Sequence, residues 1–178
     1  MRPMSEKLIP EHIDPFRYAE QGLLLEGGVH IVDMPRLKEA VHDHQGLVWA
    51  VLQFGVDEQG IHFLRGNLKA TLVLQCQRCM EPFICEIIPH FALGIVNTLD
   101  EANTLPEQYE PALARENDLA LRELIEDEII LNLPIIPRHE PEACQVKLPL
   151  TDSGWEQGKG ENPFHVLESL KHDRKGER

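Results

Sequence analysis

The stretch Leu72-Val-Leu-Gln-Cys76-Gln-Arg-Cys79-Met-Glu-Pro-Phe83 decides how this chain is organised. An apolar, strand-like run arrives at Cys76 and a second apolar run leaves from Phe83, so a hairpin turn is expected between them. The turn contains a Cys-x-x-Cys pair, and two thiolates at this spacing can bind one metal ion. One pair supplies half of a tetrahedral site, so further ligands must come from a distant segment.

Two residues late in the chain are candidates for the other half of this site. Cys144 is the only cysteine far from the turn, and His139 lies shortly before it. With Cys76 and Cys79 they would make a mixed sulfur and nitrogen set, which zinc accepts. Two other interpretations stay open, namely packed thiols without a metal and a redox pair in the turn. Cys85 is interpreted as a small buried strand residue rather than a ligand.

The sequence around the turn predicts an antiparallel meander. From Leu47 to Val96 apolar side chains recur at every second residue, which is typical of strands with one buried face. Residues 57–60, Asp-Glu-Gln-Gly, supply a hairpin loop in which glycine can take a positive φ. The return strand could break near Gly66. The strand that leaves the cysteine turn is expected to run on to about Val96.

Helix start signals appear at three places outside the meander. An Asp or Asn that can cap free N–H groups precedes each predicted helix, and proline opens two of them. The expected helices are Pro15 to about Gly22, Pro35 to about His42 with Asp33 as cap, and Leu119 to about Leu133 after Asn117-Asp118. Thr98 to Asn117 is acidic, lacks a period and is expected to be a long surface loop.

The third predicted helix carries one carboxylate among its apolar side chains. At 100° per residue its apolar arc contains Leu121, Leu124, Ile125 and Leu131, and Glu128 falls in the middle of that arc. A carboxylate there must be paired, protonated or facing a site, because an unpaired buried charge is costly. The open interpretations are a structural pair with an arginine such as Arg17, a bend that exposes Glu128, and a contact to a partner.

The remaining acids of this helix suggest a second kind of site. Glu123, Glu126 and Asp127 could bind a divalent cation such as Mg²⁺, as a metal-dependent ribonuclease would require. The alternative is a solvated helix face. The sequence contains no Ser-His-Asp order and no phosphate-binding glycine loop, and its nine histidines are scattered. No catalytic residue is therefore assigned.

Composition limits the class of protein. The 178 residues are 42% hydrophobic and 26% charged, which is typical of a globular chain. We expect a cytoplasmic protein with reduced thiols, since no apolar leader is visible and no apolar run approaches the ~18 residues of a membrane span. The net charge of −13 argues against a protein that coats nucleic acid non-specifically.

One globular domain with a C-terminal tail is predicted. Residues 1–144 should form a single globular α+β domain. Residues 145–178 should form a flexible linker followed by a short helix, because Gly154, Gly158 and Gly160 precede an Asn162-Pro163 start. The fold class is α+β: an antiparallel meander sheet that could curl toward a barrel, with the acidic helix packed across it and the C-terminal helix tethered.

Basic residues near the turn are candidates for contacts to a partner. Arg78 projects from the turn between the two cysteines and is the best single candidate for a phosphate or base contact. Arg138 and Lys171 could extend the same surface. The alternative is ordinary solubilising charge.

Taken together these motifs resemble the YceD family, the large ribosomal RNA subunit accumulation proteins of bacteria. The resemblance covers nearly the whole chain and rests on motifs that occur in the order of the family. They are Asp14-Pro15-Phe16-Arg17-Tyr18-Ala19, Cys76-Gln77-Arg78-Cys79 with Pro82-Phe83, residues 105–110, residues 126–131 with Leu133-Pro134, His139, Cys144, and Asn162-Pro163-Phe164 with Leu167, Leu170 and Lys171. Cys85 departs from the pattern.

The resemblance implies a role in the synthesis, processing or stability of large-subunit ribosomal RNA. It implies neither a reaction nor a zinc ion. We therefore expect a non-enzymatic accessory factor of ribosome biogenesis that binds precursor ribosomal RNA or a ribosomal protein. The alternatives are the metal-dependent ribonuclease and a protein-only module for a basic ribosomal protein, whose encounter the negative charge would speed.

Overall fold

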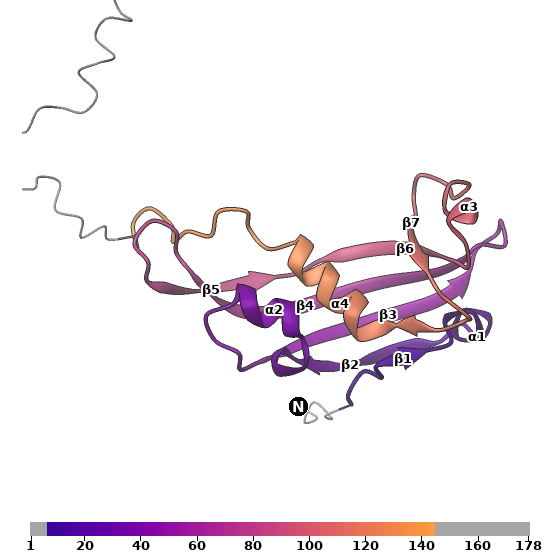
Figure 1. Cartoon of the computed structure of the whole chain (residues 1–178), viewed down its shortest axis with the longest axis horizontal. Helices are drawn as coiled ribbons and strands as arrows, with labels where there is room; N and C mark the ends of the chain where they lie inside the picture. Colours follow the sequence, from indigo (N-terminus) through magenta and orange to yellow (C-terminus); the bar gives the residue numbers. More distant parts are fainter. Residues whose placement is uncertain (1–6, 145–178) are drawn as a thin grey trace, which may run out of the picture. The chain divides into compact units, whose positions relative to one another are not determined.

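The computed structural model describes residues 7–144 as an α+β domain built on one twisted sheet (Figure 1). The elements are, in chain order, β1 (His12–Ile13), α1 (Pro15–Glu20), β2 (Leu24–His30), the 3-10 turn η1 (Ile31–Asp33), α2 (Pro35–Ala40), β3 (Leu47–Val56), β4 (His62–Gln75), β5 (Pro82–Ile87), β6 (His90–Val96), α3 (Leu99–Ala102), β7 (Glu110–Leu113), β8 (Leu119–Ala120) and α4 (Leu121–Leu131). The sheet order is β2-β3-β4-β6-β7, with β5 also paired to β4, and β1 pairs with β8 separately. No helix among residues 7–144 is long and apolar enough to cross a membrane. The predicted linker and C-terminal helix lie outside the described residues.

The strand β4 organises the sheet, and the antiparallel meander predicted from Leu47 onward is confirmed over β3, β4 and β5. The β3–β4 loop closes as predicted, because one Asp57 carboxylate oxygen accepts the backbone N–H groups of Gln59 and Ile61, each at 2.9 Å. The expected break at Gly66 is wrong. β4 continues through Gly66, which pairs with Leu52 of β3 on one side and with Phe91 of β6 on the other. Glycine is needed here because the Phe91 ring fills the space that a Cβ would take.

The sequence prediction of one strand after the cysteine turn is also corrected. β4 is long enough to pair with two successive strands, β5 beside its second half and β6 beside its first half. Both pairings are antiparallel. The chain steps from one strand to the other at Ile88-Pro89, where the Pro89 carbonyl accepts the Leu68 N–H at 3.0 Å. The hairpin β4–β5 therefore extends beyond the rest of the sheet with the cysteine turn at its tip (Figure 1).

The segment from Thr98 to Asn117 is not the structureless loop that was expected. It contains α3, capped by the Thr98 hydroxyl, and β7, which pairs with β6 in parallel. A parallel pair needs a crossover rather than a tight turn, and residues 97–109 provide it. Among the described residues the sheet is mixed and open, with β2 and β7 at its edges, rather than a closed barrel.

The core lies on one face of the sheet. Alternate residues of β3 and β4 are buried there, and α1, α2 and α4 cover them (Figure 1). The predicted apolar face of β3 is confirmed for Val48, Ala50, Leu52 and Phe54. It fails at Val56, which is 44% exposed where the strand runs out toward the hairpin loop.

The helix α4 begins and faces differently from the prediction. It starts at Leu121, because the two preceding residues pair with β1 and the expected Asn117-Asp118 cap lies too early. Its buried side chains are those of Leu121, Ile125, Glu126 and Ile129, whereas Leu131 is 74% exposed. The buried stripe is thus rotated, and Glu128 is a half-buried flank residue rather than the centre of the apolar arc.

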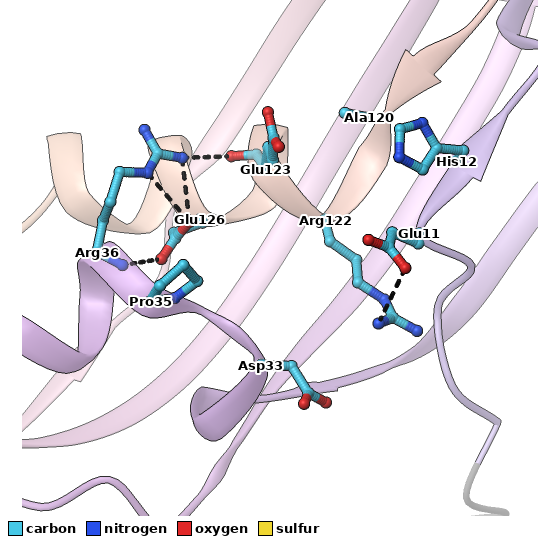
Figure 2. Close-up of a pocket in the computed structure, with 9 residues that line it drawn as sticks. All are labelled: Glu11, His12, Asp33, Pro35, Arg36, Ala120, Arg122, Glu123 and Glu126. Carbon is cyan, nitrogen blue, oxygen red and sulfur yellow. Dashed lines mark hydrogen bonds and ion pairs between the residues drawn. The ribbon is translucent and has the colours of Figure 1, made fainter.

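The buried carboxylate of α4 is that of Glu126, and it caps another helix. One of its oxygens accepts the backbone N–H groups of Arg36 and Leu37 at 2.7 and 2.9 Å, which are free donors at the start of α2. The other oxygen accepts Nε and Nη2 of Arg36 at 3.2 and 3.1 Å (Figure 2). The carboxylate of α4 that pairs with an arginine is thus Glu126, with Arg36, and not Glu128 with Arg17 as one interpretation expected. Asp33, the predicted cap, lies in η1 and the N-cap position is Met34.

Candidate metal centre

The Cys-x-x-Cys turn is a compact knuckle held by backbone hydrogen bonds. Cys76 follows β4 directly, and the Met80 N–H donates to the Cys76 carbonyl at 2.9 Å. Met80 takes a φ of 64°, which turns the chain back toward β5. The Arg78 N–H points at the Cys76 sulfur at 3.5 Å. These contacts fix the Cys76 sulfur and the path of the turn that carries Cys79.

The second half of the cluster comes from the segment that follows α4. This segment runs to the hairpin tip (Figure 1), where the Gln77 N–H donates to the Pro137 carbonyl at 2.9 Å. The His139 ring lies 5.1 Å from the Phe83 ring, between centroids. A turn then brings Cys144 inward, and its N–H donates to the Glu140 carbonyl at 3.1 Å. The Cys144 side chain is buried.

The four candidate ligands converge on one point. The Cys76 and Cys144 sulfurs lie 3.8 Å apart, and the Cys79 sulfur lies 3.3 Å from Nδ1 of His139. All four ligand atoms are within 4.8 Å of one another. A tetrahedral zinc with Zn–S bonds of about 2.3 Å has S–S edges of about 3.8 Å. The donor set and its spacing therefore fit one metal ion, and among residues 7–144 this is the only such group of His, Cys, Asp or Glu.

The pKa values of two thiols in this cluster are shifted in opposite directions. Burial opposes ionisation of Cys76, but the backbone N–H groups of Cys79, His139 and Arg78 outweigh it and lower the pKa to about 5. Burial, with the Cys76 and Cys79 sulfurs beside it, raises the pKa of Cys144 to about 11. A cation at the centre would favour the thiolate form of all three cysteines. Without a cation, a thiolate at one cysteine makes ionisation of the neighbouring cysteine less favourable.

The alternatives to a metal are constrained by the same geometry. All four cysteines are free thiols, and 3.8 Å between the Cys76 and Cys144 sulfurs is far above a bond of about 2.05 Å. The pair Cys76 and Cys79 lies at a hairpin tip rather than at the start of a helix, which is the usual place of a redox-active Cys-x-x-Cys pair. The low pKa of Cys76 comes from backbone N–H groups at the knuckle and does not need a helix. Cys85 is half-buried on β5, and burial raises the pKa of its thiol.

Two of the predicted partner-contact residues lie beside the cluster. Arg78 and Arg138 are both exposed, on the two segments that the Gln77–Pro137 hydrogen bond joins. Glu128 is not part of this group. Glu128 is on the side of α4 that faces β7, where burial and the charges of Glu110 and Asp127 raise the pKa of its carboxyl. Lys171 lies outside the described residues.

The predicted carboxylate site is occupied by an arginine instead of open to a cation. Arg36 contacts the carboxylate of Glu126 and the carbonyl of Glu123 (Figure 2). It also contacts the carboxylate of Asp127. Glu126, expected on a solvated face, is 2% exposed. Sequence reasoning missed Arg36. One signal was available in the sequence. Met34, which directly precedes Pro35, cannot cap α2 with its side chain, so the free N–H groups at the start of α2 need an acceptor from another segment.

Comparison with known proteins supports the family resemblance that the sequence motifs indicated. A sequence model of the family described as "Large ribosomal RNA subunit accumulation protein YceD" matches residues 64–171, which is more than half of the chain. The chain belongs to the YceD family. The match includes all four residues of the candidate metal centre and the two arginines beside it.

A full-length relative supports the same assignment. The Large ribosomal RNA subunit accumulation protein YceD of Haemophilus influenzae is 34% identical over 172 residues, which cover 94% of this chain and 99% of the relative. No solved structure matches this YceD family member. The resemblance inferred from the motifs is therefore confirmed, and it spans both the sheet and the hairpin tip.

Proposed function

We propose that this chain is a non-enzymatic accessory factor of ribosome biogenesis in the cytoplasm. It would support the accumulation of large-subunit ribosomal RNA by binding precursor RNA or an assembling ribosomal protein. The observation that carries the proposal is the cysteine knuckle, which holds exposed Arg78 and Arg138 on two segments joined by a hydrogen bond. The family name supplies the biological process.

A zinc ion at this knuckle would have a structural role. Cys76, Cys79, His139 and Cys144 would supply all four positions of a tetrahedral ion, and catalytic zinc sites keep one position open. The ion would clamp the segment after α4 to the hairpin tip. Arginines on a clamped backbone lose less freedom when they meet a phosphate than arginines on a mobile loop. This favours a binding surface over an active site.

The two alternatives fare differently. The ribonuclease hypothesis required Glu123, Glu126 and Asp127 to face a cation, and Arg36 already contacts the last two. The protein-only module keeps one specific support. A cavity of about 310 Å³ lies between α4 and β7, with Glu110, Asp127 and Glu128 in its lining, and this charge suits a basic segment of a ribosomal protein.

The proposal is tested by ultraviolet crosslinking in cells, with sequencing of bound RNA and identification of co-purified proteins. We expect fragments of large-subunit precursor RNA or early ribosomal proteins, and at least a tenfold loss of them with Arg78→Ala plus Arg138→Ala. A matched control is Arg17→Ala plus Arg115→Ala, which removes two exposed arginines elsewhere. Recovery of neither class of partner by the wild-type chain would overturn the proposal.

The metal is tested separately by elemental analysis of protein purified without chelator. We expect one zinc per chain, lost in Cys76→Ser and in Cys144→Ser and retained in Cys85→Ser. Folded wild-type protein with substoichiometric metal would contradict the zinc site.

A further inference from the structure

The face of the sheet opposite the core is the second surface to consider. Residues paired across strands share a face, and the pairs Trp49 with Lys69, Val51 with Asn67, and Gln53 with Arg65 all point away from the buried side. We call this surface the open face. Figure 1 shows α2 and α4 together on the other side of the sheet. Tyr109 covers one end of the open face by stacking on Phe63, with ring centroids 6.2 Å apart.

A cavity of about 320 Å³ lies on this face beside Trp49. That volume is at the small end of the ~300–1,000 Å³ of ordinary ligand pockets. Its walls are the half-buried Trp49 and Leu47 and the exposed Leu8, and Lys7 and His30 stand at the same cavity. Gly28 completes it, where a Cβ would lie 2.5 Å from the Leu47 side chain. The cavity is therefore apolar, aromatic on one wall and cationic at its rim.

The charge of the open face differs from that of the chain. It carries the cations Lys7, Arg65 and Lys69 against the carboxylates Glu26 and Glu86, with Asp57 near Arg65 at its end, so its charges nearly balance within a chain of net charge −13. Glu86 is already paired with Lys69 at 2.7 Å. The opposite side presents the acids of α4. Of the two sides of the sheet, only the open face has a charge that tolerates phosphates.

Hydrogen-bonding side chains continue from the cavity across the sheet. Gln53, Asn67 and His90 are exposed on the same face, and Arg65 lies over the Phe63 ring at 4.7 Å. Sheet surfaces that bind single strands use this combination. An aromatic side chain stacks on one unpaired base, while amide and cationic side chains beyond it contact base edges and backbone phosphates. A duplex keeps its bases stacked on each other and could not fill this cavity.

We infer that the open face binds single-stranded RNA, with one base stacked on Trp49 and the backbone phosphates beside Lys7, Arg65 and Lys69. This inference rests on the proposed function and names the form of RNA and the place of contact. It is separate from the arginines of the hairpin tip, because no residue is shared between the two surfaces.

Tryptophan fluorescence of the full chain tests the inference directly. Trp155→Phe leaves Trp49 as the only tryptophan, and titration with a mixed-sequence single-stranded RNA should quench its emission to saturation. The same sequence as a duplex should bind at least tenfold more weakly. Unchanged Trp49 emission at RNA concentrations that bind by anisotropy would overturn the inference.

Two variants make the test independent of that signal. With labelled RNA, Trp49→Ala should weaken binding about tenfold, whereas Trp49→Phe should keep most of it, since stacking on an aromatic ring contributes strongly per base. Lys69→Glu changes an exposed side chain, so the fold should tolerate it, and it should weaken binding at least tenfold with a shallower salt dependence. Arg17→Glu is the matched control.

The outcomes separate this inference from the proposed function. Wild-type affinity in Trp49→Ala and Lys69→Glu, together with loss in Arg78→Ala plus Arg138→Ala, would keep an RNA role but overturn the open face. Emission of Trp49 that responds to a basic peptide or to dilution of the protein, and not to RNA, would overturn it in favour of a protein partner or a second copy. No RNA binding by the wild-type chain would overturn the open face, and it would leave the proposed function only with a ribosomal protein as partner.

Discussion

Two contacts between distant segments can be compared in this domain, and they are stabilised in different ways. At the junction of α2 and α4, Glu126 satisfies two backbone N–H groups and a guanidinium with its own two oxygens. At the hairpin tip, three sulfurs and one imidazole converge with only weak hydrogen bonds between them. The first contact is complete within the chain. The second has the composition of a ligand set, and with the proposed zinc it would depend on the ion for its strength.

A bound ion could therefore control the structure at the hairpin tip but not at the junction of α2 and α4. Loss of the Glu126 contact should destabilise the whole domain, because α2 and α4 both cover the core face. Loss of the cluster should release the hairpin tip and the segment after α4 and leave the sheet in place. Four changes test this contrast, in order of decreasing expected effect.

The largest effect is expected for Glu126→Ala. It leaves the Arg36 and Leu37 N–H groups at the start of α2 without an acceptor, and it removes the ion pair. We expect the free energy of unfolding to fall by about 3–4 kcal/mol, since each unsatisfied buried donor costs about 1–3 kcal/mol. Urea denaturation measures it. The matched control is Glu123→Ala on the exposed side of the same helix, and equal midpoints for the two variants would refute the contrast.

Removal of the metal is expected to have the next largest effect. A chelator should lower the free energy of unfolding by about 2.7 kcal/mol if the free ion was at 100 times its Kd. Hydrogen exchange should show the loss at the amides of Gln77 and Cys144 while the β3–β4 amides stay protected. Cys144→Ser should reproduce this pattern and Cys85→Ser should not. Uniform loss of protection across the sheet would show that the two contacts are not independent.

A smaller loss is expected for Arg36→Ala. Its side chain is 51% exposed, and Glu126 keeps both backbone donors after the change. We expect a loss of about 1–1.5 kcal/mol in the free energy of unfolding, which is typical of hydrogen bonds made at a partly solvated site. Lys38→Ala on the same helix is the control. A loss as large as that of Glu126→Ala would mean that the guanidinium, not the helix cap, dominates this contact.

The smallest effect is expected for Glu128→Gln, and it should stabilise. Burial and the neighbouring acids raise the folded-state pKa of Glu128 above its unfolded value, so its ionised form is unfavourable in the folded protein. The variant should gain about 0.5 kcal/mol at neutral pH, where the wild-type carboxyl is charged. The gain should vanish as pH falls through the folded pKa toward the unfolded one. Urea midpoints at several pH values measure it, and a destabilised variant would support a structural pair for Glu128 instead.

Much of the domain followed from short-range patterns. Period-two alternation predicted the buried face of β3 and β4, and Asp14-Pro15 predicted α1, where Asp14 caps the Arg17 N–H at 3.0 Å. Cys-x-x-Cys with His139 and Cys144 predicted a cluster that the structure brings together. These features depend on residue type and local spacing, which a sequence displays directly.

Other features depended on contacts that no local pattern contains. Which carboxylate of α4 is buried was decided by packing against α2, since Glu126 accepts the free N–H groups at the start of that helix. The parallel strand β7 was hidden in an acidic segment because strand pairing across a crossover is a long-range event. The cavity beside Trp49 formed only when Gly28 of β2 was placed next to Leu47 and Trp49 of β3.

The sequence alone determined the family, the buried face of β3 and β4 and the four residues of the candidate metal centre, because each can be inferred from residue type and local pattern. The tertiary structure decided that Glu126 caps α2 through the Arg36 and Leu37 N–H groups, that Arg36 occupies the acidic side of α4, and that Trp49 faces away from the core. These depend on the relative placement of segments up to 90 residues apart, where burial and hydrogen-bond satisfaction choose among partners that the sequence leaves equivalent.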